Sequence, residues 1–301
     1  MSQSIAVIGS VAFDTIETPA GRADEELGGS ATHFAVAASV FAKVHLVAPV
    51  GRDFPAEARE YLVSRGIDCS ALETRDGTTF RWHGRYHEDV NLRDTLHLDL
   101  GVFAGFRPRI ADAARAAGIV FLGNIDPRLQ AGVLEQFPAP SLVGLDTMNH
   151  WIDEARAPLE ALLPRVDLLV VNDEEARLLA QERNVVRAAR RILDLGARSV
   201  LVKRGEYGAI LFSPNSVFAV PAFPLEQVFD PTGAGDTFAG GMLGWLASTG
   251  DRSERNLRRA IVYGTVLASF VVEDFGGRRL RTLDRDAVER RYRQFVALTE
   301  F

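Results

Sequence analysis

Residues Asp230-Pro-Thr-Gly-Ala-Gly-Asp-Thr-Phe-Ala-Gly-Gly241 join a glycine turn, an acidic residue and the start of a small-residue helix. The turn Gly233-Ala234-Gly235 lets several backbone N–H groups point at one place, and the apolar stretch after it predicts a helix that begins there. A helix N-terminus carries partial positive charge and attracts phosphate. Asp236, in the first turn, could take a proton from a substrate hydroxyl, although Asp also suits a simple helix cap. Together these twelve residues favour phosphoryl transfer.

This stretch resembles the second signature of the ribokinase-like (PfkB) carbohydrate kinases, Asp-Thr/Pro-x-Gly-Ala-Gly-Asp-x-Phe. Residues 28–37, which run on to Gly51-Arg52-Asp53, are similar to the first signature of that family. Asn172-Asp-Glu-Glu175 resembles its Asn-x-x-Glu motif near the metal and phosphates. The order and spacing fit one kinase domain over residues 1–301. The resemblance implies an α/β protein with a three-layer α/β/α fold, a mostly parallel central sheet and a small β-sheet lid.

Composition agrees with one large α/β domain, since 47% of the 301 residues are apolar and 25% are charged. The single cysteine, Cys69, cannot form an internal disulfide, which favours a reducing cytoplasm. A net charge of −6 argues against nucleic acid and anionic membranes as partners. The apolar stretch within residues 1–9 is too short for a signal peptide, and it lacks the positive charge that precedes one. No apolar run approaches the roughly 20 residues of a membrane span.

Short apolar runs alternate with helical patterns, which predicts βα units and a mostly parallel sheet. We expect glycines at 66, 118 and 196 to end helices in the left-handed conformation. Strands are expected at residues 5–8, 45–50, 119–122, 141–145, 168–171, 199–203 and 209–212. Helices are expected at residues 31–41, 56–64, 110–117, 152–163, 174–181, 185–195, 240–248, 257–272 and 286–298.

Residues 78–100 alternate apolar and polar side chains, which indicates an exposed antiparallel hairpin. Such a hairpin could be an edge sheet with a solvated polar face, or a lid that excludes water from the acceptor. In the resembled family the lid combines this region with the one after the first strand, here residues 13–27, and many relatives pair two lids into a homodimer. Arg81, His83, Arg85 and His87 should share one face, and Phe80, Trp82 and Tyr86 the other.

We expect the basic face of this hairpin, with Arg81, to close over the acceptor. That arrangement favours an acceptor that carries a carboxylate or several hydroxyls. The competing arrangement turns the aromatic face inward, where it stacks on a base or sugar ring and leaves the arginines in water.

The resemblance assigns Asp236 as general base and the N–H groups of Gly233, Ala234 and Gly235 as the anion hole. Backbone donors at a helix start serve this purpose without Lys or Arg. Mg²⁺ would enter with ATP, with Glu175, acting directly or through water, and Asn172 nearby. The spacing of these two residues also fits a capping box at a helix start.

The nucleotide is expected toward the C-terminal half, beside the turn Lys203-Arg-Gly205-Glu-Tyr-Gly208, which also fits a tight hairpin turn. Tyr263 and Gly264 could flank adenine, although an aromatic residue on a helix is more often core. The resemblance further implies a monovalent cation such as K⁺. Its expected ligands are Asp230 and Thr232, together with carbonyl groups near Val271 and Gly276.

The acceptor is expected at the carboxyl ends of the first strands, where open α/β sheets bind ligands. Asp14 matches the family's substrate-hydroxyl Asp, and Gly28 and Gly29 allow close approach of the backbone. His33 stands where relatives usually carry Asn, and fits a substrate contact and a core histidine equally well. Two further candidates, Asn124 and Asp126, follow the strand at residues 119–122.

Three functions compete at this point. The first is a kinase that uses ATP to phosphorylate a hydroxyl of a sugar or sugar-like polyol. The second is a nucleoside kinase of the same fold. The third is a catalytically weak regulatory protein that binds a sugar or nucleotide, against which the intact Asp236 and glycine turn argue. A dinucleotide-dependent dehydrogenase is disfavoured because residues 9–14 lack the GxGxxG spacing.

Overall fold

A ten-stranded sheet forms the centre of the computed structural model, which describes residues 2–300. The strands run in the order β14-β13-β12-β11-β10-β9-β1-β4-β5, and β6 also pairs with β4. All pairs are parallel except β12–β13 and β13–β14, which are antiparallel. The strands are β1 (Ile5–Ile8), β4 (Val44–Gly51), β5 (Ile67–Asp68), β6 (Leu72–Arg75), β9 (Ile119–Leu122), β10 (Leu142–Asp146), β11 (Leu168–Asn172), β12 (Val200–Lys203), β13 (Ala209–Ser213) and β14 (Ser216–Val220).

Helices cover both faces of this sheet, so its central strands are buried along their whole length. One layer holds α1 (Ser30–Ala38), α2 (Ala56–Ser64), α9 (Ala234–Thr249), α10 (Glu254–Val271), α11 (Arg278–Arg281) and α12 (Arg285–Thr299). The other holds α3 (Asp112–Arg115), α4 (Pro127–Leu134), α5 (Asn149–Glu154), α6 (Arg156–Leu162), α7 (Asp173–Ala180) and α8 (Val185–Asp194). Short 3₁₀ segments are η1 (Gly101–Gly105), η2 (Leu163–Arg165), η3 (Gly205–Tyr207) and η4 (Phe275–Gly277).

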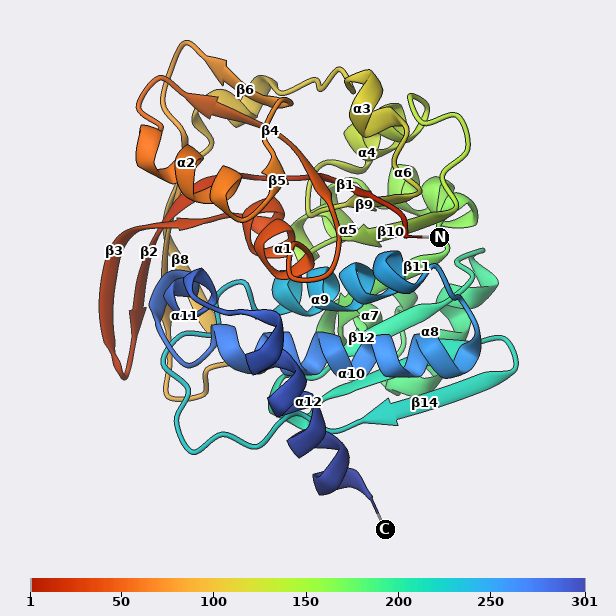
Figure 1. Cartoon of the computed structure of the whole chain (residues 1–301). Helices are drawn as coiled ribbons and strands as arrows, with labels where there is room; N and C mark the ends of the chain where they lie inside the picture. Colours follow the sequence, from red (N-terminus) through yellow and green to blue (C-terminus); the bar gives the residue numbers. More distant parts are fainter. Residues whose placement is uncertain (1, 301) are drawn as a thin grey trace.

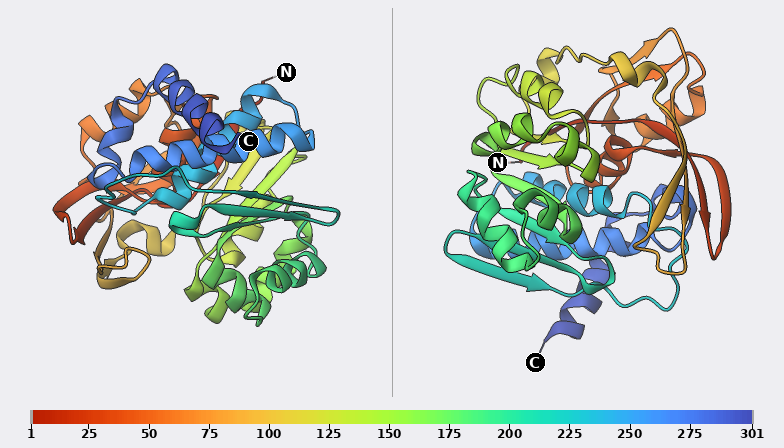
Figure 2. Two further views of the ribbon diagram at one scale, coloured as in Figure 1. Left: turned by 90° about the horizontal axis from the view of Figure 1, so that it is seen from below. Right: turned by 180° about the vertical axis from the view of Figure 1, so that it is seen from behind.

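The core therefore has two halves, one on each side of the sheet. Along β1, Ile5 and Val7 point into the half under α1 and α9, whereas Ala6 and Ile8 point into the half under α3 to α8. Figure 2 (left) shows the sheet between the two helical layers. The expected three-layer fold is confirmed.

A separate four-stranded sheet stands beside the main sheet. It consists of β2 (Ala12–Thr18), β3 (Gly21–Gly28), β7 (Phe80–Tyr86) and β8 (Arg93–Asp99), in the order β3-β2-β7-β8. Strand β2 follows β1 after three residues, and β3 leads into α1, so this sheet lies at the carboxyl edge of the main sheet. We refer to these four strands as the lid sheet; both expected segments, 13–27 and 78–100, contribute to it.

Several expected elements need correction. The helix predicted at 152–163 is two helices, α5 and α6, because Pro158 cannot donate to the carbonyl of Glu154 and its ring would clash there. Gly66 and Gly196 take positive φ values of 76° and 114° as expected, whereas Gly118 does not and simply precedes β9. The elements α4, β5, β6 and β14 were not predicted.

Within residues 2–300, no single helix has the length and apolar content to cross a membrane. One bent pair, Glu254–Val271 with Phe275–Arg281, meets those two criteria across a 103° bend.

Candidate active site

The glycine turn begins α9 at the carboxyl edge of the main sheet. Gly233 is the N-cap of α9 with φ +74°, a conformation that strains other residues. Small residues let α9 pack closely on α1, because a Cβ added at Gly240 would lie 2.3 Å from the carbonyl oxygen of Phe34. The glycine-rich starts of both helices therefore meet at one edge.

Four carboxylates converge on this edge: the buried Asp14 on β2, Asp146 at the end of β10 and Glu175 on α7, and the half-buried Asp236 on α9. Burial raises the pKa of Asp14 to about 7 and that of Asp236 to about 8. The carboxylate of Asp146 adds to the rise at Asp236, and the ammonium of Lys203 opposes it. A carboxyl group with such a pKa is a stronger base than an ordinary Asp.

Two cations lie among these acids. Lys203 ends β12, and its Nζ is 3.8 Å from Oδ1 of Asp146. Arg93 begins β8 and stands over the Trp82 ring, 5.9 Å from its centroid. Its positive charge acts on both Asp14 and Asp236. Arg93 therefore lies near both Asp14, expected to bind the acceptor, and Asp236, the expected base.

Asp14, which we expect to bind the acceptor, lies against the glycines that precede α1. A Cβ on Gly28 would lie 1.9 Å from Oδ2 of Asp14, so only glycine leaves room for this carboxylate. Gly29 has φ +92°, and a Cβ there would lie 2.5 Å from the Ser10 carbonyl oxygen. Asp14 pairs in register with Trp82 of β7, which places the two side chains beside each other on one face of the lid sheet.

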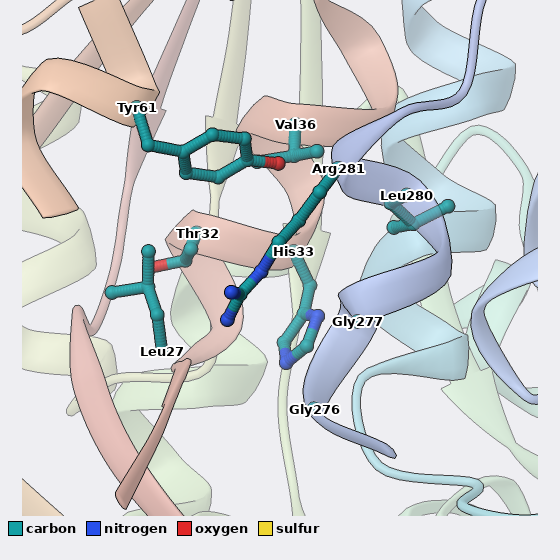
Figure 3. Close-up of a pocket in the computed structure, with 9 residues that line it drawn as sticks. All are labelled: Leu27, Thr32, His33, Val36, Tyr61, Gly276, Gly277, Leu280 and Arg281. Carbon is teal, nitrogen blue, oxygen red and sulfur yellow. The ribbon is translucent and has the colours of Figure 1, made fainter. Parts of the chain in front are cut away.

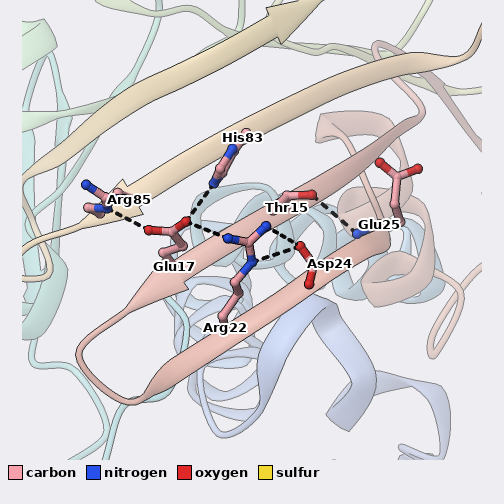
Figure 4. A network of polar contacts seen from close by, with 7 residues as sticks. All are labelled: Thr15, Glu17, Arg22, Asp24, Glu25, His83 and Arg85. Atoms are coloured by element: carbon pink, nitrogen blue, oxygen red, sulfur yellow. Dashed lines mark hydrogen bonds and ion pairs between the residues drawn. The ribbon is translucent and has the colours of Figure 1, made fainter.

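The basic face of the lid sheet points away from this site, which corrects our expectation. Glu17 accepts hydrogen bonds from Arg22, Arg85 and His83, as Figure 4 shows. Arg81 is likewise paired, 2.7 Å from Asp53 and 3.1 Å from Glu25. Carboxylates of the lid and the neighbouring loop thus neutralise the outer arginines.

The aromatic face packs inward instead. Tyr86 is buried with Ile16, Ala23 and Phe275, and Trp82 packs against this cluster. The hydroxyl of Thr232 donates to the Tyr86 oxygen across 3.1 Å. The inward aromatic face agrees with the competing arrangement considered from the sequence, whereas the outer arginines are paired with carboxylates and stacking on a base or sugar ring stays a prediction.

The tip of the β7–β8 hairpin also reaches the opposite end of the site. A Cβ on Gly205 would lie 2.4 Å from Oδ1 of Asn91. Gly205 begins η3, the turn between β12 and β13, with φ +53°. The hairpin therefore contacts Asp14 through Trp82 and this turn through Asn91.

His33 lies behind the glycine turn. A Cβ on Gly233 would be 2.4 Å from the imidazole ring, and burial lowers the pKa of His33 to about 4. Its Nε2 and the Oγ1 of Thr32 are buried without hydrogen-bond partners within residues 2–300. Both residues line a cavity of about 10 Å³ that Tyr61 and Arg281 help to close (Figure 3). This is space for roughly one water. The neutral His33 ring packs against Gly233 and supports the turn from that side.

Similarity to known proteins agrees with this geometry. Residues 142–282 match the model of the pfkB family carbohydrate kinases. The chain is 31% identical over 278 residues to a cytidine kinase of Thermococcus kodakarensis, which covers 90% of this chain and 97% of the relative. This chain belongs to the pfkB family of carbohydrate kinases.

Further similarities extend over almost the whole chain. A 2-dehydro-3-deoxygluconokinase of Thermoproteus tenax is 28% identical, over 88% of this chain and 85% of its own. The solved ribokinase of Thermotoga maritima superposes with a TM-score of 0.77 at 22% identity, over 97% of this chain and 99% of the other. Within its family this chain is an ATP-dependent phosphotransferase that acts on a hydroxyl group of a sugar or nucleoside.

Kinases of the pfkB family use ATP with a divalent metal, and the oxygen groups at this edge suit Mg²⁺. Asn172 and Glu175 form a capping box, with both hydrogen bonds 2.7 Å long, so the capping interpretation is confirmed. Only Oε2 of Glu175 is used in that box. Its Oε1 remains available to a metal-bound water. No group of three or more His, Cys, Asp or Glu side chains in residues 2–300 is arranged to hold a metal ion.

Three of the residues expected to bind a monovalent cation, Asp230, Thr232 and Gly276, lie together. Asp230 Oδ1 accepts from the Thr232 N–H at 2.8 Å, and Oδ2 accepts from the Gly276 N–H at 2.9 Å. Burial raises the pKa of Asp230. Val271 ends α10, and the next carbonyl, that of Val272, accepts from Phe229 N–H. The carboxylate of Asp230 is therefore held by N–H groups of the two segments, and K⁺ at this place stays a prediction.

Two residues expected to bind the nucleotide, Tyr263 and Gly264, are instead buried on α10. Tyr263 is 2% exposed, stacks between Trp245 and Tyr292, and donates its hydroxyl to Glu289. A Cβ on Gly264 would lie 2.7 Å from the Phe238 carbonyl oxygen, so this glycine serves the contact between α9 and α10. Gly208, with φ +86°, closes the β12–β13 turn against the Val220 carbonyl. The core interpretation of Tyr263 therefore fits the structure.

The carboxyl ends of β9 and β10 carry the remaining polar groups. Asp126 caps α4 by accepting from Arg128 N–H, whereas Oδ1 of Asn124 is buried without a partner in residues 2–300. Thr147 and Asn149, which sequence analysis missed, also have buried oxygens without partners there. Asp146, which raises the pKa of Asp236 and lies near Lys203, was not an expected site residue either. The position of these residues just after a predicted strand was the signal that could have identified them.

Proposed function

We propose that this kinase phosphorylates a ribose hydroxyl of a nucleoside. The observation that carries the proposal is the pairing of Asp14 with Trp82 on the inward face of the lid sheet. A buried carboxylate accepts hydrogen bonds from sugar hydroxyls, and an indole beside it stacks on a base. The cytidine kinase relative is consistent with such an acceptor.

The chemistry we infer begins with the acceptor hydroxyl beside Asp236. The carboxylate of Asp236 takes the hydroxyl proton as the oxygen attacks the γ-phosphorus of ATP. The N–H groups of Gly233, Ala234 and Gly235, at the positive end of α9, stabilise the charge on the phosphoryl oxygens. Mg²⁺ supplies further neutralisation when bound with ATP, with Glu175 as its nearest candidate through water.

A plain sugar or polyol is the second candidate acceptor. Asp14, Gly28 and Gly29 would serve its hydroxyls equally well. A sugar acid such as the substrate named for the Thermoproteus tenax relative is less favoured. Arg81 and Arg85, on the outer face of the lid sheet, already form ion pairs with carboxylates of this chain.

Two further features are part of this proposal. K⁺ at Asp230 would stiffen the loop that leads to the anion hole. A second copy of the chain would pair through β8, the edge strand of the lid sheet, whose residues are all exposed, with Leu96 at 44% and Leu98 at 52%.

An assay of ADP release tests the acceptor class directly. We expect cytidine and other nucleosides to give a higher kcat/KM than ribose, hexoses or sugar acids. Trp82→Ala should raise the KM for the nucleoside while that for ATP stays unchanged, and Arg85→Ala, on the outer lid face, is the matched control. Preference for a sugar acid, with equal effects of the two variants, would overturn the proposal.

A further inference from the structure

Lys203 occupies an unusual position for a lysine. It is the last residue of β12, with its side chain 19% exposed, and the carboxylates of Asp146, Glu175 and Asp236 surround it. Burial on its own would lower the pKa of Lys203, but these three carboxylates outweigh that effect and raise it. The side chain is therefore charged at neutral pH.

The ammonium group is held by charge but not by hydrogen bonds. Its nearest acidic contact, to Oδ1 of Asp146, is 3.8 Å long, which exceeds hydrogen-bond length. That oxygen instead accepts from the Thr147 N–H at 3.0 Å. Lys203 makes no side-chain hydrogen bond within residues 2–300, so its three N–H donors remain available to a ligand.

The same group lies against the glycine turn. A Cβ added to Gly235 would be 2.7 Å from Nζ of Lys203. The backbone N–H donors at the start of α9 and the side-chain ammonium are thus neighbours. A buried cation with free donors, next to a helix N-terminus, is suited to an anion.

Composition adds to this geometry. Of 34 basic residues, only Lys43 and Lys203 are lysines, and all others are arginines. Lys43 is exposed, whereas Lys203 lies in the site. Lysine presents a compact point charge, which fits beside Gly235, and arginine presents a larger planar fork.

We propose that the ammonium of Lys203 binds an oxygen of the phosphoryl group during transfer, as a side-chain member of the anion hole. The acceptor oxygen forms its bond to the γ-phosphorus as the bond to the bridging oxygen of ADP breaks, and the hydroxyl proton passes to Asp236. Lys203 keeps its proton throughout. The inference rests on the proposed anion hole at Gly233–Gly235, and it differs from our expectation that backbone donors alone suffice.

The two lysines allow a direct test by NMR. Protein labelled with ¹⁵N at lysine side chains can show at most two ammonium signals, which Lys203→Met and Lys43→Met assign. We expect Mg²⁺ with a non-hydrolysable ATP analogue to shift the Lys203 signal and leave that of Lys43 unchanged, whereas AMP should cause little shift. An equal response to AMP and to the triphosphate, or no response to either, would overturn the proposal.

Kinetics supply the second test. Lys203→Met should lower kcat roughly 10²-fold or more, as loss of one anion-hole donor does, while Lys43→Met leaves it unchanged. Lys203→Cys alkylated with 2-bromoethylamine, which restores an ammonium at nearly the same distance, should recover much of the loss. Full activity of Lys203→Met would refute the assignment. Because the NMR test needs no acceptor, it stands even if the nucleoside proposal fails.

Discussion

Thr232 donates its hydroxyl hydrogen to the phenolic oxygen of Tyr86 across 3.1 Å, and this bond joins the turn before the anion hole to the lid sheet. Thr18 makes a second such connection through the Phe229 carbonyl at 2.8 Å. The ion pairs of Glu26 with Arg278 and Arg281 join the lid sheet to α11 as well. The lid is thus docked on the same loop that leads to the proposed catalytic residues.

Tyr86→Phe should loosen this docking without unfolding the protein. A hydrogen bond of this kind contributes about 1 kcal/mol, so we expect a several-fold rise in the acceptor KM and more ATP lost to water. The ratio of ATP hydrolysis to acceptor phosphorylation measures this. Tyr207→Phe, at an exposed tyrosine, is the control; equal ratios in both variants would exclude a role for the Thr232 bond.

Activity should rise with pH because the proposed base must be deprotonated. Burial raises the pKa of Asp236 to about 8 in the free protein, so kcat/KM for ATP should fall as pH drops below that value. Bound Mg²⁺ favours the carboxylate, and the limb for kcat at saturating ATP should therefore lie at lower pH. A kcat/KM that is flat between pH 6 and 9 would argue against Asp236 as the titrating base.

Asp236→Asn should lower turnover by roughly 10² or more and yet stabilise the ligand-free protein at high pH. A carboxyl group whose folded pKa is raised binds its proton more tightly when folded, so the fold loses stability as pH rises from the ordinary Asp value of 3.8 to about 8. The gain in Tm should be largest at pH 9 and small near pH 4, close to the ordinary pKa of 3.8, where little of this loss has occurred. A gain of equal size at both pH values would contradict this explanation.

The two glycines of the anion-hole turn should respond differently to a methyl group. Gly233→Ala is strained, with φ +74° and a Cβ 2.4 Å from the His33 ring, and should cost on the order of 1–3 kcal/mol of unfolding free energy. Gly235→Ala meets only the flexible end of Lys203. It should therefore keep its stability and lose turnover. Denaturant unfolding and kcat, measured on both variants, check this contrast.

Removal of K⁺ should slow the enzyme without unfolding it. Without K⁺, Asp230 keeps its hydrogen bonds to the Thr232 and Gly276 N–H groups, but the positive charge of the ion near the glycine turn is lost. We expect kcat to be higher in K⁺ than in a tetramethylammonium buffer of equal ionic strength. Asp230→Asn should abolish that difference; equal rates of the wild type in the two buffers would exclude the site.

The sequence was sufficient for the fold and for the glycine turn because local patterns encode both. Strands such as Ile119–Leu122 are apolar runs, and the residues of α9 are contiguous in the chain. The orientation of the lid was not predictable in this way. Alternation separates Arg81 from Trp82, but which face turns inward depends on Glu17, Glu25 and Asp53, which belong to other segments.

The break between α5 and α6 was readable from Pro158, whereas the core role of Tyr263 depended on distant aromatic partners. Asp146 and Lys203 meet only because β10 and β12 both flank β11. Contacts between strand ends follow from the strand order, which the apolar runs alone do not specify.

The reach of the β7–β8 hairpin from Asp14 to Gly205 has a consequence for the timing of the catalytic cycle. Asn91 rests on the turn at the nucleotide end while Trp82 covers the acceptor end. A hairpin that contacts both expected ends would uncover both of them when it lifts. Phosphorylated acceptor and ADP would then leave after one shared opening event, and the frequency of that event, rather than the chemistry, would set the ceiling on turnover.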